Sequence, residues 1–360
     1  MATANKYLDL HLPKCLYIEI TNRCNLRCRS CILYRGGWEP HRDMSLEEFQ
    51  GVIGQLPNLQ RAVLHGIGEP LLNPQLPLMI RALKERQVFV LFNSNAILLN
   101  NRRQEELIEA GLDELRISLD AATSRGYQNV RQSDKFEAIV DNIAAFSKRL
   151  AASRSPRPKL SLWFLATREN VRELPDFIEL ASSLGIAQVY LQRLVHFLDN
   201  DGYGLARSEN ALKNADEGIT ALITRSMVRA RELGIQFSAS GLTDPLQSLQ
   251  PECRSAKPWQ NCLRPWQVLY VTAHGNVLPC CISPFSTVDY QAIILGNVFK
   301  NRVRDVWFGP KYQQFRQAII LITCLRLATT VRMRVAAKCG TIFINTIPAM
   351  IITLPRVNRL

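Results

Sequence analysis

The stretch TNRCNLRCRSC, residues 21–31, places Cys24, Cys28 and Cys31 on one short segment that directly follows a β-type run. A tetrahedral metal site takes four ligands, and four-iron clusters are usually held by four thiolates. Three thiolates from one loop therefore leave one iron of such a cluster open to an exogenous ligand. Two other interpretations stay open: half of a structural zinc site, which more usually begins with C-x2-C, and cysteines buried by coincidence.

Short β-type runs alternate with longer helical stretches from residue 14 to about 195. One predicted helix follows Ser45, because Ser45 and Glu48 have the spacing of a capping box, and another begins at Phe136. Strands separated by helices pair in parallel through right-handed crossovers, which predicts an α/β fold. Six such units favour a partial (β/α)6 barrel of the TIM type over a closed eight-fold barrel. The predicted strands are 15–20, 61–66, 88–95, 114–120, 160–167 and 187–195.

The composition changes along the chain and divides it into further segments. After a barrel core at 14–200 we expect a helical connection at 201–252 and a small C-terminal extension at 253–317. In the extension, two β-type runs are joined by a short hairpin connection in which Gly275 can adopt a positive φ. A helix that is interrupted near Gly309 then completes the extension.

The charge of the chain is distributed unevenly. It has 44 Lys and Arg against 31 Asp and Glu, a net charge of +13, which ordinarily favours a polyanionic partner. The segment from Gln317 to Leu360, however, contains no acidic residue and is rich in Ile, Thr and Arg. Because much of the excess charge lies in this atypical basic tail, 318–360, we do not expect a nucleic-acid partner.

The first residues do not have a basic flank followed by an apolar run, so they do not resemble a secretory signal. No stretch reaches the length of an uninterrupted apolar membrane span. We therefore expect a cytoplasmic protein without membrane contact. In a reducing compartment, its ten cysteines are expected to serve metal binding or catalysis rather than disulfide bonds.

The spacing C-x3-C-x2-C directly after a first strand resembles the signature of the radical S-adenosylmethionine (radical SAM) superfamily. The segment HGIGEP, residues 65–70, ends the second predicted strand and is similar to the Gly-Gly-Glu-Pro motif of that family. The resemblance implies that Gly66, Gly68 and Glu69 contact the methionyl group of the cofactor. These residue types suit that task, because a carboxylate pairs with an ammonium group and glycine allows close approach of the chain.

Two further segments resemble later strands of this family. FNSNAILL is similar to its third-strand element, which implies that Asn93 and Asn95 are polar groups beside the cofactor. RISLD and the residues after it resemble its fourth-strand region, which implies that Ser118, Asp120 and Arg131 face the cofactor or the substrate. The alternative is that Ser118 acts as a cap and that Arg131 forms an ion pair on the surface.

The second cysteine group, CLRPWQVLYVTAHGNVLPCC, resembles the SPASM or twitch extension of radical SAM enzymes, which carries an auxiliary iron-sulfur cluster. The resemblance implies Cys262 and Cys280 as ligands of that cluster. At least one of Cys253 and Cys281 is expected to be a packing residue.

The tail departs from the family pattern. A close final C-x2-C pair is usual there, but this chain has Cys324 and Cys339, which lie far apart. A reading-frame change near residue 318 would produce such a tail. The alternative is a natural amphipathic or partner-binding segment.

The resemblance also implies a reaction and its cofactors. A 4Fe-4S cluster on Cys24, Cys28 and Cys31 reductively cleaves SAM to a 5'-deoxyadenosyl radical, which abstracts hydrogen from a substrate. We expect flavodoxin or ferredoxin as the electron donor and a peptide or protein as the substrate, since relatives with this extension often modify peptides. Modification of a small molecule or of RNA is the alternative within the superfamily. A zinc-binding scaffold or a nucleic-acid-binding protein is the alternative outside it.

Overall fold

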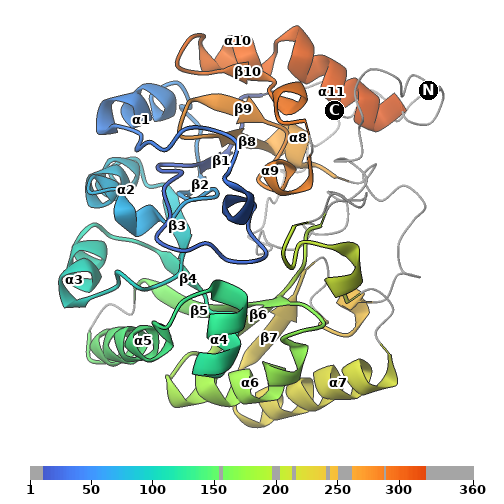
Figure 1. The fold of residues 1–360 in the computed structure, drawn as a ribbon. Helices are drawn as coiled ribbons and strands as arrows, with labels where there is room; N and C mark the ends of the chain where they lie inside the picture. Colours follow the sequence, from blue (N-terminus) through green and yellow to red (C-terminus); the bar gives the residue numbers. More distant parts are fainter. Residues whose placement is uncertain are drawn as a thin grey trace, which may run out of the picture.

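Ten strands form one continuous, curved sheet (Figure 1). The computed structural model describes residues 11–153, 157–196, 203–212, 216–240, 244–249, 262–287 and 289–321. Within these residues the order of the strands across the sheet is β10-β9-β8-β1-β2-β3-β4-β5-β6-β7. The strands are β1 Cys15–Ile18, β2 Arg61–Val63, β3 Phe89–Ser94, β4 Glu114–Ser118, β5 Lys159–Ala166, β6 Gln188–Arg193, β7 Gln236–Ala239, β8 Val268–Val271, β9 Asn276–Leu278 and β10 Gly296–Asn297.

Strands β1 to β7 are parallel and follow the order of the sequence. The predicted α/β class, the partial barrel and the six predicted strands are thereby confirmed. The segment 201–252, predicted as a helical connection, contains helix α7 (Glu217–Glu232) and also a seventh parallel strand, β7, that was not predicted. The sequence of β7 is QFSA, which is too short and too polar to show a strand pattern. The predicted domain boundaries themselves stay predictions.

Helices cover the outer face of the sheet between successive strands (Figure 1). The capping box predicted for α1 is present: the hydroxyl of Ser45 accepts from the backbone N–H of Glu48, and the carboxylate of Glu48 accepts from the backbone N–H of Ser45. None of the described helices is both long and apolar enough to cross a membrane. The helices are α1 Leu46–Ile53, α2 Leu76–Lys84, α3 Asn101–Glu109, α4 Ser124–Arg131, α5 Phe136–Ala151, α6 Leu174–Ser183, α7 Glu217–Glu232, α8 Arg264–Gln267, α9 Ser283–Ser286, α10 Val303–Trp307 and α11 Pro310–Leu321.

The two faces of the barrel strands differ in polarity. In β4, Leu115 and Ile117 are fully buried in the main apolar core, whereas Arg116 and Ser118 line an interior cavity. Successive side chains of a strand point to opposite faces, so this alternation places the polar residues inside the curve of the sheet. In β3, Phe92 belongs to the same core. The interior of the barrel therefore offers polar groups to a ligand.

The C-terminal extension continues the barrel sheet. Strand β8 pairs in parallel with β1, with Tyr270 opposite Tyr17, and β8 and β9 form an antiparallel hairpin. The predicted positive φ at the hairpin connection is confirmed, since Gly275 has a φ of +77°. The pairing of β8 with β1 was not predicted, because nothing in either strand sequence specifies its neighbour.

One buried arginine holds helix α11 against the rest of the extension. The predicted helix is interrupted near Gly309, between α10 and α11. Arg316 of α11 is 2% exposed, and its guanidinium lies 4.3 Å from the ring of Trp307 and 4.1 Å from the ring of Tyr312. It donates hydrogen bonds to the carbonyl oxygens of Pro265 (2.8 Å) and Trp307 (2.6 Å). Arg316 therefore joins α11 to the segment that enters β8.

Replacing Arg316 by Met should lower the free energy of unfolding by about 2–4 kcal/mol, because two buried carbonyl groups lose a charged donor. Lys311 lies on the exposed side of the same helix, so Lys311→Met should change this free energy by no more than about 0.5 kcal/mol. Denaturant titration followed by circular dichroism measures both. Equal effects of the two substitutions would show that Arg316 does not fasten the extension.

Candidate active site

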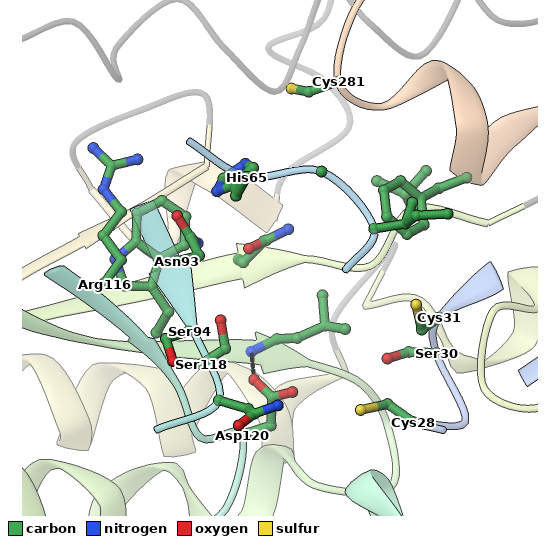
Figure 2. Close-up of a pocket in the computed structure, with 18 of the residues that line it drawn as sticks. Cys28, Ser30, Cys31, His65, Asn93, Ser94, Arg116, Ser118, Asp120 and Cys281 are labelled. Carbon is green, nitrogen blue, oxygen red and sulfur yellow. Dashed lines mark hydrogen bonds between the residues drawn. The ribbon is translucent and has the colours of Figure 1, made fainter. Parts of the chain in front are cut away.

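A cavity of about 250 Å³ lies inside the curve of the sheet, towards the carboxyl ends of the parallel strands. Parallel α/β barrels place their chemistry at this end. The loops after β1 and β2, the inner faces of β3 to β6 and the extension all contribute to its wall. Figure 2 shows that Cys28 and Cys31 lie on one side of the cavity, and that His65, Asn93 and Arg116 lie on the other.

The loop after β1 brings all three predicted thiols, Cys24, Cys28 and Cys31, to the cavity wall. The backbone N–H of Cys31 donates to the carbonyl oxygen of Cys28 at 3.0 Å, which closes a tight turn. The side-chain amide of Asn95 donates to Oδ1 of Asn25 at 2.7 Å and fastens the loop to the end of β3. The structure therefore brings the three cysteines together as predicted, while their role as cluster ligands stays a prediction.

Burial controls the protonation of these thiols. Burial raises the pKa of Cys24 and of Cys31 to about 12. Burial also raises the pKa of Cys28, and the nearby positive charge of Arg131 opposes this rise. Metal binding would take these protons away, because iron binds the thiolate. Among the described residues no group of three or more His, Cys, Asp or Glu side chains could hold one metal ion together. A cluster does not need such a group, since each thiolate binds a different iron.

Close packing explains both glycines of HGIGEP. A Cβ on Gly66 would lie 1.9 Å from Oε2 of Glu19, and one on Gly68 would lie 2.2 Å from the carbonyl oxygen of Thr21. The Glu19 carboxylate occupies the space beside Gly66 and accepts from the backbone N–H of Ile67 at 2.6 Å. Both glycines line the cavity. They therefore bring this turn directly against the start of the cysteine loop.

The carboxylate of Glu69 forms hydrogen bonds with other groups of the protein. It accepts hydrogen bonds from the hydroxyl of Ser94 (2.8 Å) and from the backbone N–H groups of Leu71 (3.1 Å) and Asn95 (2.7 Å). Burial raises the pKa of Glu69, and these three hydrogen bonds oppose the rise. Glu69 also lines the cavity, and its predicted contact with the methionyl ammonium stays a prediction. Its hydrogen bonds within the protein join the turn after β2 to the end of β3.

The two predicted asparagines have different surroundings. Both polar groups of the Asn95 side chain form hydrogen bonds within the protein. Its Oδ1 accepts from the N–H of Ile97 at 3.1 Å, and its amide group donates to the cysteine loop. Oδ1 of Asn93 is buried, and the side chain of Asn93 interacts with that of His65. Ser118 lines the cavity, and the N-cap of the following helix is Thr123 instead.

A buried ion pair lies beside the cysteine loop. Nη2 of Arg131 is 2.6 Å from Oδ2 of Asp120, and Nη1 is 3.5 Å from Sγ of Cys28. The alternative that Arg131 pairs on the surface was therefore wrong. Nε of Arg131 is buried and makes no hydrogen bond within the described part of the chain. An unbonded cationic donor beside three thiols fits an anionic group such as the carboxylate of SAM.

Sequence reasoning missed the inner end of the cavity. Tyr17, His65, Arg116, Trp163 and Tyr190 line it, and none of them was singled out by a motif. The period-two alternation of the strands could have found them, because each lies at an inward-facing position of a strand or directly after its end.

The structure also brings together Cys262 and Cys280, the two predicted auxiliary ligands. Both are buried in one small cluster with Ile282. Cys281 lines the cavity, and its Sγ accepts a hydrogen bond from Nη1 of Arg264 at 3.1 Å, so it is more than a packing residue.

Three cysteines of the sequence analysis, Cys253, Cys324 and Cys339, lie outside the described residues. Of the tail at 318–360, the structure describes only the end of α11.

Comparison with known families assigns the chain. Residues 18–181 match the family model of the radical SAM superfamily, and residues 262–339 match that of the SPASM iron-sulfur cluster-binding domain. The chain belongs to the radical SAM superfamily. It is an iron-sulfur enzyme whose cofactors are a 4Fe-4S cluster, SAM and an auxiliary iron-sulfur cluster. The second match continues past residue 318 and includes Cys324 and Cys339.

Individual proteins match over most of the chain. The PqqA peptide cyclase of Granulibacter bethesdensis is 25% identical over 315 residues, 84% of this chain and 76% of that protein. The tungsten-containing aldehyde ferredoxin oxidoreductase cofactor-modifying protein of Pyrococcus furiosus is 30% identical over 317 residues, 84% of this chain and 83% of that protein. Streptococcus suis SuiB bound to SAM shares the fold, with a TM-score of 0.67 at 18% identity over 88% of this chain and 70% of SuiB. SuiB has also been solved with its precursor peptide SuiA.

Replacing Gly68 by Ala should lower the iron content of the reconstituted protein several-fold, because the new Cβ would overlap the backbone of Thr21 and displace the cysteine loop. Gly51, in the interior of α1, is the matched control, since a Cβ there meets nothing within 4 Å. Gly51→Ala should bind iron as the unchanged protein does, and should raise the free energy of unfolding by about 0.5–1 kcal/mol. Iron and acid-labile sulfide assays measure the first effect. Normal iron content in Gly68→Ala would contradict the role assigned to this contact.

Proposed function

We propose that Cys24, Cys28 and Cys31 hold the 4Fe-4S cluster and that the groups beside them bind SAM. The observation that carries this assignment is the placement of three thiols on one cavity wall, next to Arg131, whose buried Nε has no partner among the described residues. When bound, the cofactors supply the difficult chemistry, the reductive cleavage of SAM to a 5'-deoxyadenosyl radical that abstracts hydrogen from the substrate. The protein orients them and keeps water away.

The side chains and backbone have separate tasks in this proposal. Arg131, which Asp120 holds in place at 2.6 Å, donates to the carboxylate of SAM. The turn at Gly66 and Gly68 lets the backbone approach the methionyl group closely. Asn93 lies across the cavity from the cysteines and is assigned to the substrate side instead (Figure 2). The proposed cofactor contacts are Gly66, Gly68, Glu69, Asn95, Ser118, Asp120 and Arg131.

A peptide or protein is the proposed substrate. The relatives support this class, because one is named a peptide cyclase and the fold is shared with SuiB, which has been solved with a precursor peptide. A small-molecule substrate is the second candidate, since the Pyrococcus furiosus relative is named a cofactor-modifying protein. An auxiliary cluster on Cys262 and Cys280 would bind substrate or accept the electron that remains after hydrogen abstraction.

The remaining partners and the location are part of the same proposal. Flavodoxin or ferredoxin would deliver the electron, because a radical SAM reaction begins with a reduced cluster. A cytoplasmic location would keep the free cysteines of the two groups reduced and available to iron.

Anaerobic reconstitution with iron and sulfide tests the assignment. The protein should become brown, be bleached by dithionite, and release 5'-deoxyadenosine from SAM. Replacing Cys24, Cys28 or Cys31 by Ala should reduce this release to the level of a blank without protein, because the cluster then lacks a ligand.

Cys15 provides the matched control. It lies in β1 but not on the cavity wall, so Cys15→Ala should release 5'-deoxyadenosine at the unchanged rate. A colourless protein with stoichiometric zinc and no 5'-deoxyadenosine would favour the zinc-binding alternative and contradict the proposal.

A further inference from the structure

Four polar residues line the cavity away from the cysteine loop, and three of them have no part in the proposed cofactor chemistry; the fourth, Ser118, is also a proposed cofactor contact. We call His65, Asn93, Arg116 and Ser118 the inner polar group. Asn93 of β3 lies opposite Arg116 of β4 in the parallel register, and Ser118 follows two residues later on the same face. Figure 2 shows His65, Asn93 and Arg116 together, across the cavity from the cysteine loop.

Arg116 is the charged member of this group. It is 7% exposed, its Nε donates to Glu114 at 2.6 Å, and its guanidinium lies 4.7 Å from the ring of Trp163. Its two terminal nitrogens form no hydrogen bond with any residue that the structure describes, although Arg116 lines the cavity. A guanidinium held in this way presents a planar set of N–H donors, which matches the geometry of a carboxylate.

The neighbouring side chains are neutral and polar. Nδ1 of His65 and Oδ1 of Asn93 are buried, and an interaction with Asn93 opposes the fall in the pKa of His65. Burial lowers the pKa of His65 to about 4, and the charge of Arg116 contributes, so the imidazole is neutral at pH 7 and keeps one N–H. His65 and Asn93 therefore present a neutral polar wall beside Arg116.

The surrounding charge favours an anion. Burial raises the pKa of Tyr190, which lines this end of the cavity, whereas the positive charges of Arg116, Arg193 and Arg264 all lower it. Glu114 is the carboxylate that Arg116 contacts directly. Of these three arginines Arg116 lines the cavity, so a negative charge beside its guanidinium would be stabilised.

We propose that the inner polar group binds a carboxylate of the substrate, with Arg116 as its direct partner. The inference rests on the proposed function and narrows its substrate to a peptide that carries an acidic side chain or a free C-terminal carboxyl group near the reacting carbon. The rings of Trp163 and Tyr190, stacked at 4.1 Å, would pack along the aliphatic part of that residue. Anchored in this way, its carbon atoms would extend towards the cysteine loop, where the radical is formed.

Binding of small probes to the reconstituted, full-length protein with SAM tests the inference. The probes are N-acetylglutamic acid amide, its neutral counterpart N-acetylglutamine amide, N-acetylalanine with its terminal carboxylate, and inorganic phosphate. Ligand-observed NMR titrations give the affinities. At least one carboxylate probe should bind about tenfold or more tightly than the glutamine amide, as expected for a charge-assisted hydrogen bond. The better of the two carboxylates identifies the source of the charge.

Variants assign the preference to Arg116. Arg116→Gln should abolish the difference between the carboxylate and the amide, whereas Arg125→Gln, on the exposed side of α4, should preserve it. If Arg116→Gln does not fold by circular dichroism, Arg116→Lys decides. A lysine keeps the charge but cannot form two parallel bonds, so the preference should fall several-fold.

Several results would overturn the inference. They are equal binding of charged and neutral probes, no measurable binding of either carboxylate, tighter binding of phosphate than of both carboxylates, or an unchanged preference in the Arg116 variants. Release of 5'-deoxyadenosine by the unchanged protein is measured separately. Release without a carboxylate preference contradicts only this inference, and a preference without release contradicts only the proposed function.

Discussion

The contact between the turn at Gly66–Glu69 and the cysteine loop is the constraint on which the site depends. It is a contact between two backbones: Gly68 leaves no room for a Cβ against Thr21, and the N–H of Glu69 donates to the carbonyl oxygen of Arg23 at 2.8 Å. The carboxylate of Glu69 then accepts hydrogen bonds from the end of β3. Three segments that are far apart in sequence are thereby held together at the carboxyl ends of the strands. These bonds position the three thiols on one wall of the cavity.

Strand β4 connects the two ends of the cavity. Arg116 and Ser118 on this strand and Asp120 just after it all line the cavity at intervals of two residues. Asp120 holds Arg131 beside Cys28, at the end where the cofactor is assigned. Arg116 lies at the opposite end, where we place the substrate. In this proposal, one rigid strand would set the distance between the cofactor and the substrate, which suits a reaction that depends on positioning.

Local sequence predicted much of the fold and of the cofactor end. The cysteine loop, the two glycines and the capping box of α1 are specified by neighbouring residues, so a short motif was enough to find them. The parts that were missed depend on tertiary pairing. Strand β7 has only four residues, and the parallel contact of β8 with β1 joins segments about 250 residues apart.

The same limit applies to the site. Arg131 contacts Cys28 across 103 positions, and no local pattern showed that its ion pair is buried. Arg116 follows the inward-facing register of β4, and a charged residue there is a further signal, because buried parallel strands are normally apolar on both faces. The polar interior, and with it the proposed substrate subsite, became apparent only when neighbouring strands were aligned in register.

In the proposed site, three thiolates hold a cluster whose remaining iron binds SAM. Electron-nuclear double resonance of the reduced protein, with SAM that carries a magnetic isotope of oxygen in its carboxylate, tests this claim most directly. We predict a hyperfine coupling between the cluster and the labelled oxygen, and its loss when any of Cys24, Cys28 or Cys31 is replaced. A reduced cluster that binds SAM without such a coupling would contradict the account.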